Sequence, residues 1–376
     1  MRPSLAPLLL ALALPGLGLA ESHPPERARK GMVAADNATA SAEGAKVLAE
    51  GGDAVDAAVT TALVLGVVHP FASGIGGGGF AVVHRKAGEP FALDFREVAP
   101  AKASADMYLD GDGEVIKDAS RVGPKAAGVP GELAGLWALH QAHGKLPWAR
   151  VVAPALRLAE GGFPMHPLLH KRLARALERV AAVPALAAAV LDADGKPLAV
   201  GQTVKRPNLA RTLKTIQRAG AEPFYRGAIA QKIAAAMAAD GGLISAEDLA
   251  GYQVKRRPLV AIDWRGYRVL SMPPPSSGGA VLAQVLKVLE PVDLKALGHN
   301  SSAYLHRLAE ALKHAFADRA RIMGDPDFTP VPVDELLGER AIARVRGAFR
   351  PDRTLERADY GLPFDLPQDG GTTHFS

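Results

Sequence analysis

The sequence predicts a large α/β protein, and three observations support this. The chain has 376 residues, of which 48% are hydrophobic and 22% charged, a globular composition that excludes wholesale disorder. Long Ala- and Leu-rich stretches have the apolar periodicity of helices. Shorter segments, such as residues 91–97, alternate with the period of a strand. The length allows two or three domains or one large α/β domain.

The composition also excludes several functional classes. The chain has no cysteine, which rules out a disulfide scaffold, thiol catalysis and cysteine-ligated zinc. The net charge is +5, but the positive charges are dispersed, and their densest runs lie at residues 27–30 and 255–257. Neither run is interleaved with aromatic residues, so we expect a solvated, mildly basic surface and no nucleic-acid partner.

The first twenty residues are typical of an export signal. Arg2 supplies a positive start, Leu5 to Leu19 an apolar stretch, and small residues a cleavage site before Glu21. Pro15 interrupts the apolar stretch, and no later stretch reaches the roughly 18 apolar residues of a membrane helix. We therefore expect an exported protein, periplasmic or extracellular, with no stable membrane span.

Two helices are expected near the start of the exported chain. They follow a short apolar strand at 31–35. The first, at 39–50, has an apolar side and stops at the following glycines. Asp53 caps the second, at 54–68, which is apolar almost all round and is therefore expected to be buried.

A run of glycines at residues 74–79 lies between the second helix and a strand at 80–83. Its spacing formally matches G-x-G-x-x-G, but a phosphate-binding loop follows a strand and opens a helix, and here the order is reversed. We expect these glycines to allow the backbone to approach a neighbouring strand or a substrate closely.

Residues 91–97 alternate with a period of two, which places Arg96 on the opposite face of a strand from an aromatic row. Arg96 could form a structural ion pair with Asp94 or Glu97, or it could anchor a substrate carboxylate. The pattern alone favours the ion pair.

The rest of the chain predicts mainly helices. Ser245 has the spacing of a capping box, and a proline-rich loop at 272–279 opens a helix. In order, we expect helices within 130–163, broken at Gly144 and Gly161, within 168–191, interrupted at Pro184, and at 229–239; then a short helix after Ser245, a strand at 259–270, and helices at 280–289, 302–323 and 339–346.

Several histidines could suggest a catalytic or metal site. His140 with His143, and His166 with His170, have metal-like spacing, but no third ligand is evident, so surface or capping roles are favoured. His374 lies beside two threonines, yet the chain lacks the G-x-S-x-G sequence that would favour a Ser/His/Asp triad.

Thr372 is a candidate nucleophile of another kind. A threonine hydroxyl needs a neighbouring base, and a threonine at the start of a chain can use its own α-amino group. Such an amine has a pKa of about 7.7–8.0, which suits base catalysis at neutral pH. Exposing it requires cleavage of the Gly371–Thr372 bond. On this chemistry alone, an ordinary surface threonine is the alternative.

Several motifs, taken together, resemble those of the gamma-glutamyltranspeptidase family. They occur in family-like order from about residue 31 to the last residue, and they are Gly51–Ala58, Gly74–Phe80, Leu93–Pro100, Pro273–Gly279, Ala317–Arg319 with Gly324–Pro326, and Thr372–Ser376. The resemblance implies an N-terminal nucleophile hydrolase fold, an αββα sandwich. It also implies a precursor that cleaves itself between Gly371 and Thr372.

The resemblance further implies the domains and the roles of residues. The signal would span 1–20, the large subunit 21–371, and the start of the small subunit 372–376. Thr372 would attack the γ-glutamyl amide of glutathione, and Arg96 would bind the α-carboxylate of the substrate. Water or the amine of an amino acid or peptide would then accept the γ-glutamyl group. No metal or organic cofactor is implied.

Only five small-subunit residues are expected in this chain, so the oxyanion donors of the family cannot be placed in it. Because these donors stabilise the transition state, we expect the chain alone to be inactive. It would need a small subunit as its heterodimer partner. Two other functions stay open. One is a related acylase that cleaves another amide, such as a glutaryl side chain. The other is a non-catalytic exported binding protein or pseudoenzyme. Arg96 in its motif favours the γ-glutamyl substrate, and the intact Thr-Thr-His motif disfavours a pseudoenzyme.

Overall fold

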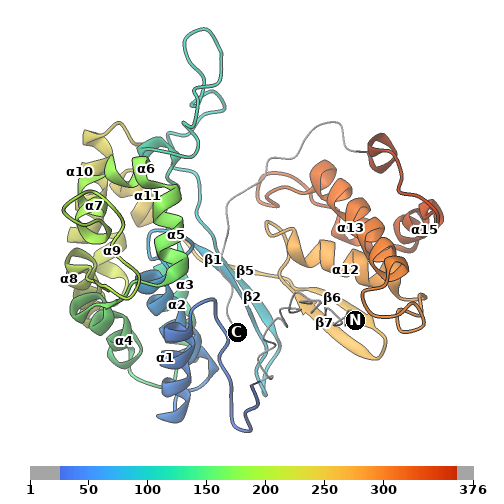
Figure 1. The fold of residues 1–376 in the computed structure, drawn as a ribbon, viewed down its shortest axis with the longest axis horizontal. Coiled ribbons are helices and arrows are strands. Elements are labelled where there is room, and N and C mark those ends of the chain that lie inside the picture. The colour runs from blue at the N-terminus through green and yellow to red at the C-terminus, as the bar shows by residue number, and fades with distance from the viewer. Residues whose placement is uncertain (1–25, 362–376) are drawn as a thin grey trace, which may run out of the picture. The chain divides into compact units, whose positions relative to one another are not determined.

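The computed structural model describes residues 26–361 (Figure 1). The export signal and the Gly371–Thr372 junction predicted from the sequence lie outside this range. Residues up to Met32 form a separate unit, whose described part at 26–32 contains no helix or strand. Val33 begins the compact unit that holds all the elements below. Residues 31–35, predicted as a strand, form no named strand within the described chain, although Ala35 takes part in a β-bridge.

Two helices open the compact unit, as the sequence predicts. α1 spans Ala38–Ala49 and α2 spans Ala54–Val68. Asp53 caps α2 in a capping box, because its carboxylate accepts two backbone N–H groups while Asp56 bonds back to the N–H of Asp53. α2 is buried along almost its whole length, where it packs against α1 and α4 (Trp148–Gly161).

The main sheet has three antiparallel strands in the order β1-β2-β5 (Figure 1). They are β1 (Gly79–Val83), β2 (Phe91–Phe95) and β5 (Lys255–Arg257). The register pairs Gly79 with Phe95, Val83 with Phe91, and Asp94 with Lys255. β1 and β2 confirm predicted strands, although β2 ends one residue before Arg96. The basic run at 255–257 was expected to form only a solvated surface, but it forms β5 and pairs with β2.

Helices pack on this sheet and on one another around the largest apolar core. The core includes Val59, Leu63, Leu133, Val151 and Ile216. The remaining elements of this group are α3 (Glu132–His143), α5 (Pro167–Arg175), α6 (Leu177–Ala181), α7 (Pro184–Val190), α8 (Pro207–Ala219), α9 (Glu222–Tyr225), α10 (Ala228–Ala239) and α11 (Ala246–Gly251), with the strand pair β3 (Phe163–Pro164) and β4 (Thr203–Val204) and the 3₁₀ turn η1 (Pro124–Ala126). The predicted helical stretch at 168–191 is three helices, and Pro184 begins the last of them.

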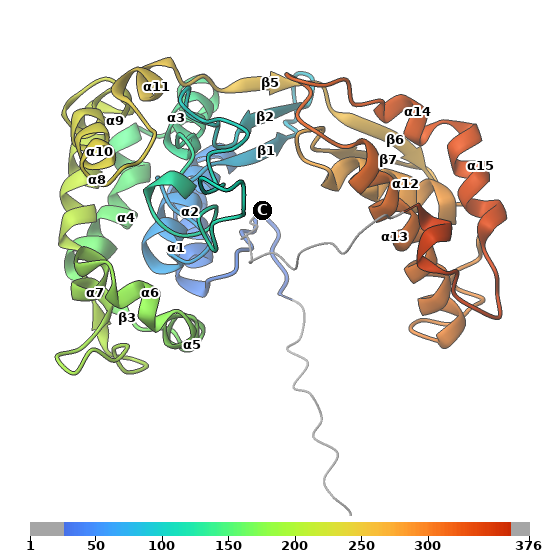
Figure 2. The same cartoon turned by 90° about the horizontal axis from the view of Figure 1, so that it is seen from above.

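A second group of elements follows β5. The predicted strand at 259–270 is a hairpin of β6 (Val260–Trp264) and β7 (Tyr267–Ser271), because Arg265 and Gly266 adopt positive φ and reverse the chain. α12 (Gly278–Leu289) packs against this hairpin (Figure 2). The other elements are α13 (Ser302–Ile322), α14 (Val333–Leu337), α15 (Glu339–Ala348) and the 3₁₀ turn η2 (Arg357–Tyr360).

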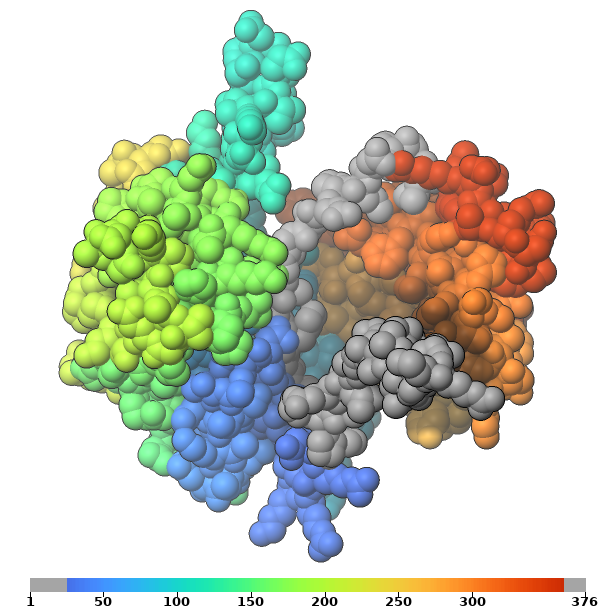
Figure 3. Space-filling model, in the orientation of Figure 1, coloured from blue at the N-terminus to red at the C-terminus, as the bar shows by residue number. Residues whose placement is uncertain are grey.

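Exposed aliphatic residues gather on the segment between β2 and α3, part of which stands out from the surface in Figure 3. Leu109, Val115, Ile116 and Val122 lie on it, and Val115 is 76% exposed. Within residues 26–361, none of the helices combines the length and the hydrophobicity needed to cross a bilayer.

Candidate active site

Arg96 directly follows β2, and its two peptide groups are both hydrogen-bonded. The N–H of Arg96 donates to Asp94 Oδ1 at 3.1 Å. The carbonyl of Arg96 accepts from the Tyr252 hydroxyl at 2.8 Å. Gly78 packs so closely that a Cβ there would lie 2.8 Å from the Arg96 carbonyl carbon. The backbone at Arg96 is therefore held by side chains on two sides and by a glycine on a third.

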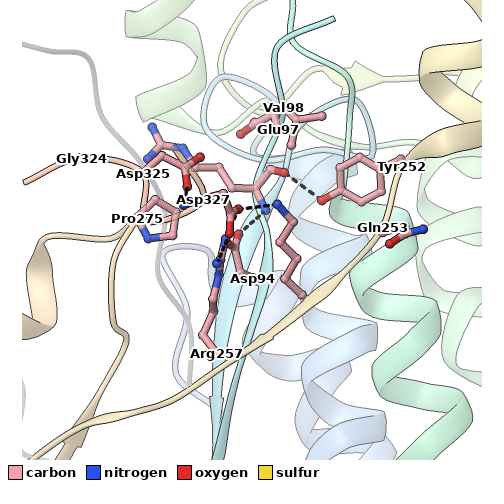
Figure 4. Close-up of a pocket in the computed structure, with 12 residues that line it drawn as sticks. Asp94, Glu97, Val98, Tyr252, Gln253, Arg257, Pro275, Gly324, Asp325 and Asp327 are labelled. Carbon is pink, nitrogen blue, oxygen red and sulfur yellow. Dashed lines mark hydrogen bonds and ion pairs between the residues drawn. The ribbon is translucent and has the colours of Figure 1, made fainter. Parts of the chain in front are cut away.

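The Arg96 side chain is exposed and faces a cavity of about 340 Å³. The cavity is lined by Asp94, Arg96, Glu97, Val98, Tyr252, Gln253, Lys255, Arg257, Pro275, Gly324, Asp325 and Asp327 (Figure 4). Within residues 26–361 the Arg96 guanidinium forms no ion pair, because Asp94 pairs with Arg257 instead. The prediction that Arg96 pairs with Asp94 or Glu97 is therefore wrong. Its guanidinium is available to an anion.

Arg257 is the centre of an ion-pair cluster beside Arg96. Its Nε and Nη2 donate to Asp94 Oδ2 at 3.0 and 2.9 Å. Its Nη1 and Nη2 donate to Asp327 Oδ1 and Oδ2 at 2.7 Å each, and Lys255 also pairs with Asp327. Figure 4 shows Arg257 pointing toward both carboxylates. These partners, Arg257 first, hold the pKa of Asp327 well below its ordinary value.

The glycine run forms part of the wall of a second, larger cavity of about 1130 Å³. Arg96 and Glu97 line this cavity as well as the smaller one, and Ser276, Gly278 and Gly279 contribute from the loop before α12 and its first residues. A Cβ at Gly78 would lie 2.5 Å from the Phe95 carbonyl, so the run approaches a neighbouring strand closely, as predicted.

The start of α3 holds the glycine run in place. The carbonyl of Gly77 accepts from the N–H groups of Gly131 and Glu132 at 2.8 and 2.9 Å. The Glu132 carboxyl is buried and lines the larger cavity. Burial is the main cause that raises the pKa of Glu132, a hydrogen bond with the Gly74 backbone opposes it, and the charge of Glu97 adds to it, so that the pKa is about 8. Glu132 is thus a neutral acid at pH 7.

The candidate histidines have structural partners. Each ring bonds to a neighbouring group: His140 to the Leu146 carbonyl, His143 to Arg85, His166 to the Leu168 N–H at the start of α5, and His170 to the Leu198 carbonyl. Among residues 26–361, no group of three or more His, Cys, Asp or Glu residues could hold a metal ion. The other candidates, Thr372, Gly371 and His374, lie outside the described residues.

Sequence reasoning missed most of the cluster around Arg96. Asp94 lies in the Leu-Asp-Phe-Arg-Glu motif, but the basic run that contains its partner Arg257 predicts only a solvated surface. The available signal was the alternation of Lys255 and Arg257, which places both side chains on one face of a strand. Tyr252, Glu132 and Asp327 carried no local signal of this kind.

The fold places the chain among the N-terminal nucleophile hydrolases, the class of its structural neighbours. The structure resembles that of gamma-glutamyltranspeptidase from Helicobacter pylori, with a TM-score of 0.86 and 40% identity over 92% of this chain and 100% of that one. The family model of gamma-glutamyltranspeptidase matches residues 40–376. This chain belongs to the gamma-glutamyltranspeptidase family.

Curated relatives include two kinds of enzyme. The chain is 44% identical over 315 residues to the glutathione hydrolase proenzyme of Escherichia coli K12, a match that covers 84% of this chain and 54% of that protein. It is 40% identical over 331 residues to the acylase ACY 1 proenzyme of Pseudomonas sp. strain V22, a match that covers 86% of this chain and 59% of that protein. The chain thus spans little more than half the length of these relatives.

Proposed function

We propose that the chain is the large-subunit part of an exported γ-glutamyl acyltransferase and hydrolase that acts on glutathione and related γ-glutamyl compounds. The boundaries would be an export signal at 1–20, the large subunit at 21–371 and the start of the small subunit at 372–376. The observation that carries the proposal is Arg96, an exposed guanidinium that has no ion-pair partner within residues 26–361 and faces two cavities.

Arg96 suits the α-carboxylate of a γ-glutamyl group. A guanidinium presents two parallel N–H donors to the two oxygens of a carboxylate, and such bidentate pairs are the stronger class of hydrogen bond. Because Asp94 is already paired with Arg257, it does not compete with a substrate for Arg96. The carboxylates of Glu97 and Asp325 line the same cavity and could contact the positive α-amino group.

The proposed reaction begins with self-cleavage at Gly371–Thr372. The freed α-amino group of Thr372 then takes the proton from its own hydroxyl, and the oxygen attacks the γ-carbonyl of the bound substrate. The C–N bond breaks, the proton passes to the leaving amine, and a γ-glutamyl ester remains on Thr372. Water or the amine of an amino acid or peptide then attacks the ester and frees the hydroxyl.

The competing function is an acylase for another amide, which the similarity to the acylase ACY 1 proenzyme supports. The two functions differ in what they require around Arg96. Both a γ-glutamyl and a glutaryl group carry the carboxylate that Arg96 would bind, but only the γ-glutamyl group also carries an α-amino group, for which Glu97 and Asp325 are available.

Turnover of matched donors tests the proposal. The complete gene product is incubated with glutathione and with glutaryl-cysteinylglycine, and release of cysteinylglycine is measured. We expect a strong preference for glutathione, because only this donor carries the α-amino group, and Arg96→Gln should lower the turnover of both donors, because both carry the carboxylate. Arg85→Gln is the control, because Arg85 is an exposed arginine that lines neither cavity. Equal turnover of the two donors by the parent protein would instead favour the acylase.

A further inference from the structure

We propose that Asp94 and Tyr252 are positioning residues that fix the Arg96 side chain for carboxylate recognition, and that Arg257 and Asp327 keep Asp94 in place. The proposal rests on the function proposed above for Arg96. None of these four side chains is assigned a role by the chemistry of γ-glutamyl transfer itself, yet all four line the cavity that Arg96 faces.

The Tyr252 side of Arg96 is rigidly supported. The Tyr252 ring stacks on the buried Tyr225 ring, with centroids 5.8 Å apart and planes 23° apart. The Tyr225 hydroxyl is itself fixed, because it donates to the Pro130 carbonyl and accepts from the Ala134 N–H, both at 3.0 Å. A Cβ at Gly131 would lie 1.9 Å from the Tyr252 hydroxyl oxygen, so that hydroxyl closely contacts the start of α3.

The Asp94 side is fixed by charge. One carboxylate oxygen of Asp94 accepts from the Arg96 N–H, and the other accepts twice from Arg257. Arg257 is in turn held by Asp327, which comes from the loop after α13. The Arg257 and Asp94 side chains are only 12% and 8% exposed, so the pair is shielded from water and its geometry is well defined.

These contacts fix the direction in which the Arg96 side chain leaves the backbone. The N–H and carbonyl of a residue flank its Cα, so holding both groups fixes the Cα–Cβ bond. A bidentate contact to a carboxylate depends on placing both N–H donors together, and a supporting shell of hydrogen bonds provides that placement. A shift at Arg96 should therefore weaken binding of the carboxylate while leaving the chemistry at the γ-carbonyl intact.

A merely structural role for Asp94 and Tyr252 predicts something different. In that case their loss would lower the stability and the amount of active protein, and every donor would be affected alike. Positioning predicts a rise in KM for donors that carry an α-carboxylate, with little change in kcat. A donor without the carboxylate, 4-aminobutanoyl-cysteinylglycine, should be insensitive, because it does not use Arg96.

The test compares Tyr252→Phe and Asp94→Asn with Tyr225→Phe in the complete gene product. Tyr225→Phe is matched, because it also removes a bonded hydroxyl from the same stacked pair, but that hydroxyl does not contact Arg96. We expect Tyr252→Phe and Asp94→Asn to raise KM for glutathione by about 3- to 10-fold, the usual range for one lost hydrogen bond. The kcat for glutathione and the kcat/KM for 4-aminobutanoyl-cysteinylglycine, which lacks the carboxylate, should stay within about 2-fold of the parent values.

The outcomes separate the two proposals. A parent protein that releases no cysteinylglycine from glutathione overturns the proposed function, and this inference with it. An active parent whose Tyr252→Phe and Asp94→Asn variants have the same KM for glutathione as the parent overturns the positioning role alone. Equal losses with both donors would also overturn it, since they would indicate a structural role.

Discussion

Replacing Glu132 with glutamine should make the folded protein more stable at neutral pH. The carboxyl of Glu132 is buried at the start of α3, and its pKa in the folded protein is about 8, against an ordinary value of 4.5. Glutamine has almost the same shape and keeps an oxygen that can accept from the Gly74 backbone. The substitution therefore removes the ionisable proton and preserves the packing.

The direction in which the free energy of unfolding changes with pH depends on whether the folded or the unfolded protein binds more protons. Below pH 4.5 the carboxyl is protonated in both the folded and the unfolded protein, so its ionisation contributes nothing. Between pH 4.5 and 8 the unfolded chain releases the proton while the folded protein retains it, so stability falls as pH rises. At pH 7 the loss amounts to about 3 kcal/mol, at 1.36 kcal/mol for each pH unit above 4.5.

Urea unfolding of the parent and Glu132→Gln proteins at pH 5, 6, 7 and 8 measures this effect. The free-energy difference between the two should grow with pH in favour of the variant. Glu89→Gln is the control, because Glu89 is exposed and lines neither cavity. A difference that does not change between pH 5 and 8 would refute the claim that Glu132 is held neutral.

Three further substitutions test the packing around the site and in the core. Gly131→Ala should lower the free energy of unfolding by about 3 kcal/mol or more, because its Cβ would lie 1.9 Å from the Tyr252 hydroxyl; an unchanged melting temperature would contradict this. Asp56→Ala should cost about 3–5 kcal/mol in urea unfolding, since buried Asp56 accepts the N–H groups of three residues, and Asp56→Asn should cost less. Leu133→Ala should cost about 2–5 kcal/mol, because Leu133 is 0% exposed, whereas the exposed Val115→Ser should change unfolding by less than about 0.5 kcal/mol.

Local signals in the sequence were sufficient to predict the positions of most of the helices. Asp53 caps α2 where the sequence places the cap, and Ser245 forms the capping box of α11 that its spacing predicts. These predictions succeed because a cap acts on backbone groups only two or three residues away. The sequence predicts one strand at 259–270 where the structure has a hairpin, because the turn at Arg265-Gly266 lacks the Asn-Gly or Asp-Gly pair that usually marks such a turn.

The candidate site depends on contacts that local signals do not reach. Asp94 and Arg257 are 163 positions apart in the chain, and Arg257 and Asp327 are 70 apart. Alternation along residues 91–97 could place Arg96 and Asp94 on one face, which favoured an ion pair between them. The alternation could not show that Asp94 forms its ion pair with the distant Arg257. The basic run at 255–257 was misjudged for the same reason.

The identity of the first residue of the small subunit tests the central claim most directly. Intact-mass measurement and N-terminal sequencing of the complete gene product should find two fragments, one of which begins at Thr372. The Thr372→Ala protein should remain a single chain. A mature product in which Thr372 stays inside an uncut chain, or in which cleavage persists at the same bond without the threonine, would contradict the claim that this residue cleaves the precursor and then carries the γ-glutamyl group.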